Sequence, residues 1–375
     1  MTSPKIPLSS PDITEAEIEA VAATLRSPQL SLGPRLIEFE ATFTDLTGVE
    51  HAIAVSSGTA GLHLAMLALG IGAGDEIIVP SFTFIAAANA IRYVGATPVF
   101  VDIDGLTLNL SPAAVERAIN PRTRAILAVH TFGVPADMPA LVALARRHHL
   151  ALIEDACEAL GTTIDAQPVG SFGNVAVFAF YPNKQITTGE GGMIVTRDPG
   201  LAAHMRSLRD QGRAPTDSWL QHTEVGYNYR LSEIACTLGI GQMRRLTSIL
   251  YRREEIAGLY RQHLNSEARL TLPIHELPGC RISWFVYVVR LADELPAGQR
   301  DQVIHELEQA GIGCGRYFAP IHLQPAYADL ALASDLRKTE SIASRTIALP
   351  FFNRINDSQI VTVCEALTLA IRRIS

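Results

Sequence analysis

The chain has 375 residues, of which 48% are hydrophobic and 18% charged, so it can bury a large core, and its length favours two domains. Its net charge of −7 provides no basic field for nucleic acid or an anionic membrane surface, and we expect neither as a partner. No stretch approaches the roughly 18 uninterrupted apolar residues of a membrane span, and the first residues contain no apolar signal segment.

Short apolar runs alternate with amphipathic segments over about the first 200 residues. The apolar runs predict buried strands at 77–79, 98–101, 125–129, 150–153 and 175–179, and the amphipathic segments predict helices at 60–69, 112–119 and 138–148. Continuous apolar strands separated by helices indicate a mainly parallel sheet covered on both faces. Ligands of such sheets bind at the carboxyl ends of the strands, so polar residues that directly follow these strands are the candidates for chemistry.

The alternation stops near residue 200, and the remaining segments predict a second, smaller α+β unit. A helical stretch at 231–264 leads to a strand at 282–290, a helix at 301–310 and a final amphipathic helix at 357–374. We therefore expect a large domain over residues 1–245, which includes an N-terminal arm, and a small C-terminal domain over residues 246–375.

The five cysteines are scattered, and none forms a C-x-x-C pair. This spacing argues against a disulfide framework and against a zinc site, so we expect no metal. A reducing cytoplasm is the expected compartment. Cys157 lies in an acidic stretch, and we expect it to be a buried structural thiol.

Lys184 is the candidate nucleophile. It lies in the run Phe178-Ala-Phe-Tyr-Pro-Asn-Lys-Gln-Ile-Thr-Thr-Gly-Glu-Gly-Gly192, where apolar residues and glycines surround it. Desolvation disfavours the ammonium form, and a neutral amine can form an imine with an aldehyde cofactor such as pyridoxal phosphate (PLP). Taken alone, the run is also compatible with a tight strand-turn-strand that carries one snorkelling lysine.

Asp155 ends the run Leu150-Ala-Leu-Ile-Glu-Asp155, which places a carboxylate at the carboxyl end of a buried strand. Burial of an unpaired carboxylate is costly, so Asp155 should have a cationic partner. One interpretation is an N-cap for the segment that begins at Ala156. The other is a partner for the pyridinium nitrogen of PLP, which would let the ring accept electrons.

Two further segments follow predicted strands or precede helices. Ser56-Ser-Gly-Thr-Ala-Gly61 precedes a helical run, and free N–H groups at a helix N-terminus suit a phosphate dianion, although such residues are also ordinary caps. Ser81-Phe-Thr-Phe-Ile85 places aromatic rings just past a strand, either in the core or stacked on a flat heterocycle. A phosphate site, a buried aspartate and a reactive lysine, in this order, are the arrangement of fold type I PLP enzymes.

The motifs carry a specific resemblance over nearly the whole chain. They are Leu30-Ser-Leu-Gly-Pro34, Ser57-Gly-Thr-Ala60, Val79-Pro-Ser-Phe-Thr-Phe84, Val129-His-Thr-Phe-Gly133, Ile153-Glu-Asp-Ala-Cys-Glu-Ala159, Tyr181-Pro-Asn-Lys-Gln185, Gly226-Tyr-Asn-Tyr-Arg230, Pro320-Ile-His-Leu-Gln324 and Leu349-Pro-Phe-Phe-Asn353. With these motifs the chain resembles the sugar aminotransferases of the DegT/DnrJ/EryC1/StrS family. The resemblance implies a fold type I PLP-dependent transferase with an α/β large domain, a mainly parallel mixed sheet and a smaller α+β domain.

The resemblance also implies roles for single residues. Lys184 matches the Schiff-base lysine, Asp155 the carboxylate on the pyridine nitrogen, and Phe84, rather than Phe82, the aromatic residue that stacks on the ring. Further cofactor-binding matches are Gly58 and Thr59 at the phosphate, Glu158 near the phenolic oxygen, and Asn228, which reaches the phosphate of the neighbouring subunit's cofactor and so makes a homodimer part of the site. Segments that line the sugar-nucleotide pocket in relatives contain Leu32, Tyr181, Arg230, Tyr317 and His322.

Two residues depart from the pattern of the family. Ala179 stands where many relatives have a serine that meets the phosphate, and the lost charge-assisted hydrogen bond is worth roughly 1.5–3 kcal/mol, so PLP should bind more loosely or depend more on Asn228. Glu158 stands where relatives often have glutamine. An ionised carboxylate cannot donate a hydrogen bond, so we hypothesise that Glu158 is protonated or faces elsewhere.

The expected activity is a PLP-dependent transamination (EC 2.6.1 type) of a nucleotide-linked keto-sugar, with an amino acid as donor, by resemblance L-glutamate. Two substrates that use one pocket in turn predict ping-pong kinetics. Amination of a keto-cyclitol, as in aminoglycoside pathways, and a regulatory paralogue without turnover are the alternatives. The dehydratase branch of the family has a histidine in place of the lysine, and the presence of Lys184 argues against it.

Overall fold

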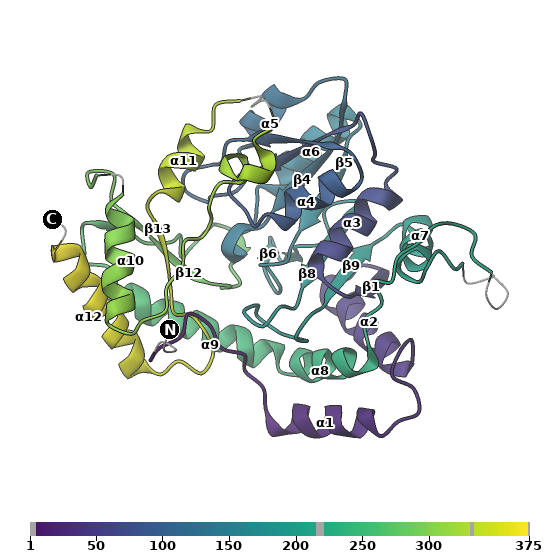
Figure 1. Cartoon of the computed structure of the whole chain (residues 1–375), viewed down its shortest axis with the longest axis horizontal. Helices are drawn as coiled ribbons and strands as arrows, with labels where there is room; N and C mark the ends of the chain where they lie inside the picture. Colours follow the sequence, from purple (N-terminus) through teal and green to yellow (C-terminus); the bar gives the residue numbers. More distant parts are fainter. Residues whose placement is uncertain (1–4, 215–220, 297, 331–333, 374–375) are drawn as a thin grey trace.

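The computed structural model describes residues 5–214, 221–296, 298–330 and 334–373. Its centre is a seven-stranded sheet in the order β1-β9-β8-β5-β4-β2-β3 (Figure 1). The strands are β1 (His51–Val55), β2 (Glu76–Pro80), β3 (Thr97–Val101), β4 (Thr123–Val129), β5 (Ala151–Asp155), β8 (Val175–Ala179) and β9 (Gly192–Thr196). Neighbouring strands pair in parallel except at β9, which is antiparallel to both β1 and β8. The predicted fold class is confirmed.

Alternate residues of these strands point to opposite faces, and both faces are buried under helices. In β8, Val175 and Val177 face a core that includes α3 (Gly58–Ala68), α4 (Ala86–Tyr93) and α7 (Pro199–Arg209). Ala176 and Phe178 face the other side, which is covered by α2 (Pro34–Thr47), α5 (Pro112–Ala118), α6 (Met138–His148) and α8 (Glu233–Arg244). Burial on both faces is the reason that these strands are mostly apolar.

The predicted strands and helices of the large domain are all present, with ends shifted by a few residues. The structure adds elements that were not predicted: the five-residue strands β1 and β9 and the helices α1 (Glu15–Leu25), α2, α4 and α7. β9 begins with Gly192, at the end of the glycine-rich run around Lys184. The run is therefore a strand-loop-strand, as the alternative interpretation allowed, and Lys184 lies in its loop.

The C-terminal part contains a separate antiparallel sheet, in the order β10-β12-β13. Its elements are α9 (Leu246–Leu264), β10 (Leu270–Thr271), β12 (Tyr287–Leu291), α10 (Gln299–Gln309), α11 (Arg337–Ala343), β13 (Thr346–Leu349) and α12 (Asp357–Arg373). Helices α9, α10 and α12 share a second core with this sheet (Figure 1). A third, small sheet joins β6 (Thr163–Ile164), β7 (Gln167–Pro168) and β11 (Cys280–Arg281), and 3-10 turns lie at Thr131–Gly133, Ile321–Leu323 and Pro325–Tyr327.

Two predicted elements of this part were wrong in their extent. The helix predicted over 231–264 is interrupted at Arg245, which separates α8 from α9. The strand predicted over 282–290 begins only at Tyr287. Before it, Ser283 N donates to Thr162 Oγ1 at 3.1 Å, and Arg253 donates to the carbonyl of Phe285 at 3.0 Å. Side chains from other elements therefore occupy backbone groups that a strand would use.

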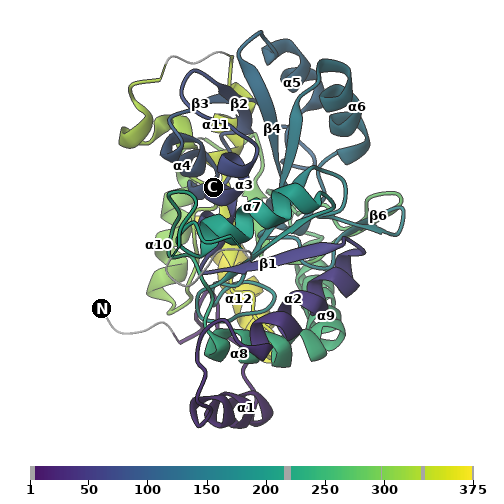
Figure 2. The same cartoon turned by 90° about the vertical axis from the view of Figure 1, so that its right-hand side faces the viewer.

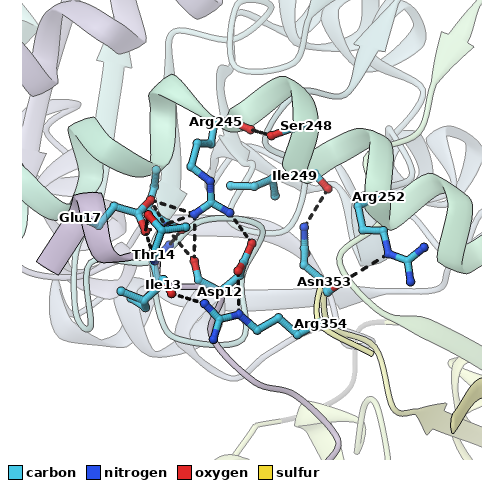
Figure 3. A network of polar contacts seen from close by, with 12 residues as sticks. Asp12, Ile13, Thr14, Glu17, Arg245, Ser248, Ile249, Arg252, Asn353 and Arg354 are labelled. Atoms are coloured by element: carbon cyan, nitrogen blue, oxygen red, sulfur yellow. Dashed lines mark hydrogen bonds and ion pairs between the residues drawn. The ribbon is translucent and has the colours of Figure 1, made fainter. Parts of the chain in front are cut away.

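The helix interruption at Arg245 is the centre of a polar network that joins the N-terminal arm to the C-terminal part (Figure 3). Arg245 donates to Asp12 at 2.5 Å and to Glu17 at 3.1 Å, and Arg354 donates to Asp12 at 2.9 Å. Helix α1, which carries Glu17, lies below α8 at the edge of the molecule (Figures 1 and 2). α9 begins directly after the network. The predicted domain boundary at residue 245 coincides with this point but stays a prediction.

No helix among the described residues is long and apolar enough to cross a bilayer.

Candidate active site

A pocket lies at the carboxyl ends of the parallel strands, where the sequence predicts a ligand site. It has a volume of about 610 Å³. Lining residues follow β1, β2, β5 and β8 in the chain, and a second group comes from the C-terminal part. The lining residues are Ser57, Gly58, Thr59, Leu62, Thr83, Phe84, Ala86, Val129, Asp155, Cys157, Glu158, Ala179, Tyr181, Asn183, Lys184, Glu190, Gly191, Phe285, Arg316, Tyr317 and Phe318.

Lys184 enters this pocket from the loop between β8 and β9. Its side chain is only 14% exposed, and its Nζ lies 3.5 Å from Glu158 Oε1. Nζ also lies 4.0 Å from the centroid of the Phe285 ring, within the range of a cation–π contact. A snorkelling lysine would extend into solvent, so that interpretation of the run does not fit the structure.

Asp155 ends β5 and lines the same pocket, where it is 7% exposed. The backbone N–H of Cys157 donates to its Oδ1 at 3.1 Å. Among the described residues, no lysine, arginine or histidine forms an ion pair with Asp155. A buried carboxylate requires a compensating cation or several hydrogen bonds, so a ligand with a protonated ring nitrogen would supply what the chain does not.

Gly58 and Thr59 begin α3, whose first N–H groups have no acceptor within the helix. The Ser57 hydroxyl accepts from Ala60 N at 3.0 Å and so forms the N-cap. A Cβ on Gly58 would lie 2.7 Å from Ala179 Cβ and 2.9 Å from Cys157 Sγ, closer than atoms can approach. Only glycine therefore fits between α3 and β8, and this close approach brings the helix N-terminus to the pocket wall, where a phosphate group would be stabilised.

Ala179 lies beside this helix N-terminus, and Ala179→Ser should tighten PLP binding by about tenfold, because a hydroxyl hydrogen bond to a charged group is worth roughly 1.5–3 kcal/mol. The measurement is titration of the apoprotein with PLP. Thermal unfolding of the apoprotein controls for strain against Gly58. An unchanged dissociation constant in a stably folded variant would mean that the phosphate does not lie beside residue 179.

The two phenylalanines after β2 have different environments. Phe84 lines the pocket and is 60% exposed, whereas Phe82 is fully buried and packs edge-to-face on Phe132 and Phe318. The structure therefore makes Phe84 available to stack on a flat ring, as the resemblance implies, and gives Phe82 a role in the core.

Glu158 faces Lys184 and does not point away from the pocket. Its Oε2 accepts a hydrogen bond from Phe132 N at 2.9 Å, and its Oε1 is the atom near Lys184 Nζ. Burial raises the pKa of Glu158, although Lys184 acts in the opposite direction. This direction supports the hypothesis that Glu158 carries a proton.

Glu158→Gln should change the pH dependence of the protein. In the unfolded chain Glu158 loses its proton near pH 4.5. Because its pKa is raised in the folded chain, the folded protein keeps this proton over a pH window that begins there. The free energy of unfolding contributed by this group therefore falls as pH rises through the window, and glutamine should remove that slope in urea denaturation of the apoprotein. The pH titration of the visible PLP band should also shift. Glu190→Gln, on the same pocket, is the control, and unchanged behaviour of Glu158→Gln in both measurements would refute the protonation hypothesis.

Of the predicted substrate residues, Tyr181 and Tyr317 line the pocket. Tyr181 is exposed, and burial raises the pKa of Tyr317. Leu32, Arg230 and Asn228 do not line the pocket of their own chain. Arg230 pairs with Asp210 at 2.7 Å, and Asn228 forms a backbone bridge with the same residue.

His322 is also outside the lining of this pocket, and its role as a substrate residue stays a prediction. Its side chain is 1% exposed and lies between two partners, with Nδ1 at 2.7 Å from Ser81 Oγ and Nε2 at 3.2 Å from Glu340 Oε1. The imidazole thus joins the end of β2 to the C-terminal part. Both ring nitrogens are engaged, which is why it does not reach the pocket in this chain.

Several lining residues were missed from the sequence. Cys157 is a half-buried thiol on the pocket wall and not the fully buried thiol that was expected, and Asn183 Oδ1 is buried there without a hydrogen-bond partner among the described residues. Phe285 and Arg316 come from the C-terminal part. Only the proximity of Arg316 to Tyr317 in the chain could have indicated one of them. Within the described ranges, no group of three or more His, Cys, Asp and Glu side chains could hold a metal ion.

Comparison with known proteins agrees with this geometry. The profile of the DegT/DnrJ/EryC1/StrS aminotransferase family matches residues 11–368. The chain is 43% identical over 366 residues to the GDP-perosamine synthase of Caulobacter vibrioides, a match that covers 97% of this chain and 98% of the relative.

Two solved structures are similar over almost their full length. DesV of S. venezuelae, in complex with a ketimine intermediate, is 36% identical with a TM-score of 0.91, and the match covers 100% of both chains. The PLP form of Spr1654, a putative sugar aminotransferase from Streptococcus pneumoniae, is 29% identical with a TM-score of 0.94, and the match covers 99% of both chains.

Proposed function

The chain belongs to the DegT/DnrJ/EryC1/StrS aminotransferase family and is a PLP-dependent sugar aminotransferase, and on this premise we propose that it aminates a nucleotide-linked keto-sugar with L-glutamate as the donor. The observation that carries the assignment of the site is the meeting of Lys184 with Asp155 in one pocket. The lysine has an amine that a cofactor can use, and the buried aspartate has no cationic partner among the described residues.

The residues of the pocket fit PLP from one end to the other. Lys184 would hold its aldehyde carbon, Asp155 its ring nitrogen, and Phe84 the face of its ring, while Gly58 and Thr59 would bind its phosphate. When bound, PLP supplies an aldehyde that condenses with amines and a ring that accepts electron density.

The chain's own residues then perform the proton transfers. With PLP and the amino donor bound, the Lys184 amine would act as the general base that takes a proton from the α-carbon of the donor and as the general acid that returns it. With the keto-sugar bound instead, the same amine would move the proton in the reverse direction. Glu158, 3.5 Å from Nζ, is positioned to influence the charge of this amine.

The proposed substrate rests on the relatives and on the pocket. The Caulobacter relative is named for a GDP-linked amino sugar. The pocket has a volume of about 610 Å³, and the tyrosines at positions 181 and 317 on its lining have hydroxyl groups for a sugar. A cytoplasmic location, where nucleotide sugars are made and used, is part of the proposal.

A homodimer is also part of the proposal. Asn228, Arg230 and Leu32 do not line the pocket of their own chain, and Leu32 is 38% exposed. Residues with such positions can complete the pocket of a second subunit, with Asn228 at the cofactor phosphate and the other two at the substrate. His322 contacts Ser81, after β2, and Glu340, in α11. It would act on the pocket only by positioning the segments that carry these two residues.

The experiment is an assay of the purified protein with PLP, L-glutamate and a panel of 3-keto and 4-keto sugars linked to GDP, UDP or dTDP. We expect 2-oxoglutarate and an amino sugar from at least one nucleotide-linked substrate, with ping-pong kinetics. Activity on a free keto-cyclitol alone would overturn the proposed substrate class. Failure of glutamate to bleach the visible PLP band, while another amino acid does so, would overturn the proposed donor.

A further inference from the structure

Arg316 is a cation of the pocket that the assigned cofactor site does not use. Among the described lining residues, the cationic side chains are Lys184 and Arg316, and Lys184 is committed to the cofactor. The Arg316 side chain is 51% exposed, so it lies on the open side of the pocket and not at its floor. Its segment comes from the C-terminal part, directly before Tyr317.

Asp301, at the start of α10, holds Arg316 by one edge of its guanidinium. Arg316 Nε donates to Asp301 Oδ1 at 2.8 Å, and Arg300 Nε donates to the same oxygen at 2.6 Å. Although burial opposes it, the hydrogen bonds from Arg316 and Arg300 lower the pKa of Asp301, which therefore stays ionised at neutral pH.

The other edge of Arg316 is available to a ligand. No described residue accepts a hydrogen bond from its two Nη groups. Arg300, in contrast, is used by the fold, because its Nη1 donates to the carbonyls of Ala343 and Thr346. One carboxylate thus faces two guanidinium groups, which leaves a net positive charge beside the pocket. The two Nη groups of Arg316 can donate paired hydrogen bonds that match the geometry of phosphate oxygens.

The remaining charges of the pocket select where an anionic substrate group can lie. Glu190 is exposed on the pocket lining, and Asp155 and Glu158 are deeper. A diphosphate that approached any of these carboxylates would meet like charge, whereas Arg316 offers the opposite charge at the open side. The sugar end of the substrate must reach Lys184, so its diphosphate trails toward the opening.

We propose that Arg316 binds the diphosphate of the nucleotide-linked substrate and that Asp301 positions the guanidinium for this contact. The inference rests on the proposed function, since it assigns a subsite to the substrate class given there. It predicts that Arg316 serves the sugar half of the reaction and not the amino-donor half, because L-glutamate carries no phosphate.

The test compares Arg316→Gln with the wild-type holoenzyme in two measurements. The first is isothermal titration calorimetry with GDP, UDP and dTDP. The nucleotide that the wild type binds best should bind about tenfold more weakly to the variant, because one half-exposed charge-assisted contact is lost. The rate at which L-glutamate bleaches the visible PLP band should stay unchanged. Arg316→Lys should restore part of the affinity, because lysine keeps the charge but lacks the fork.

Arg337→Gln is the matched control, since Arg337 is an exposed arginine that pairs with Asp335 and does not line the pocket. It should bind nucleotides as the wild type does. Asp301→Asn should weaken nucleotide binding less than Arg316→Gln, because the guanidinium remains but is less firmly held.

The possible failures are distinguishable. Unchanged nucleotide binding in Arg316→Gln would overturn the diphosphate subsite and leave the proposed function intact. A slower glutamate reaction with unchanged nucleotide binding would assign Arg316 to the donor carboxylate instead, and would also overturn the subsite. If the wild type neither binds any of the three nucleotides nor aminates a nucleotide-linked sugar, the proposed function and the subsite fail together.

Discussion

Lys184→Ala should abolish both the covalent attachment of PLP and transamination. Alanine has no amine to bond to the aldehyde carbon or to move the proton at the donor's α-carbon, and the described residues place no other lysine on the pocket. Glu158 would also lose the cation 3.5 Å away. The measurements are the visible absorbance of the purified protein, the mass of the Lys184 peptide after borohydride reduction, and turnover with glutamate.

Lys338→Ala is the control for this prediction, because Lys338 is an exposed lysine in α11, outside the pocket. It should retain the absorbance band, the cofactor-labelled peptide at Lys184 and full activity. Amination that persisted in Lys184→Ala would show that another group moves the proton and would overturn the assignment of the site.

Asp155→Asn should lower turnover by at least about a hundredfold, the usual magnitude when a preorganised electrostatic partner is removed from a transition state. An asparagine has no charge to hold the ring nitrogen in its protonated form, so the electron-accepting capacity of the ring would fall. The amide keeps the shape of the side chain and its acceptor for Cys157 N, so the fold should be retained. The measurement is single-turnover bleaching of the PLP band by glutamate, together with PLP retention after gel filtration.

Asp137→Asn makes the same chemical change at the N-cap of α6, where asparagine and aspartate are nearly equivalent caps, and it should leave turnover unchanged. If Asp155→Asn bleached with glutamate as fast as the wild type, Asp155 would be a structural residue of the turn after β5, where the described residues that follow form no helix for it to cap.

The large domain was predictable because its strands carry an unambiguous pattern. Strands such as 125–129 and 175–179 are buried on both faces, so every residue is apolar and the run stands out between helices. β9 was missed because it begins in a glycine-rich loop, and Arg245 was not recognised as a helix break because nothing local distinguishes it from other helical arginines. Its conformation depends on Asp12, more than 200 residues away in the chain.

The site was predictable as far as its residues follow strands. Asp155 ends a buried run, and Gly58 begins a helix, so their places at the edge of the sheet follow from local sequence. The choice of Phe84 over Phe82 came from the resemblance, and the structure gives its physical basis in the exposure of the two rings. His322 had no such local signal, and only the structure shows its contacts with Ser81 and Glu340.

Local sequence thus determined the class of fold and the order of the candidate cofactor residues, with Lys184 as the candidate nucleophile, because apolar periodicity and strand ends are properties of neighbouring residues. Only the tertiary structure decided that Phe285 and Arg316 belong to the same pocket. Both come from the C-terminal part and lie far from Lys184 in the chain. The packing of the C-terminal part against the large domain brings them to the pocket, and no motif indicates it. It also decided that Asp155 has no cationic partner among the described residues, the observation that most directly calls for a cofactor.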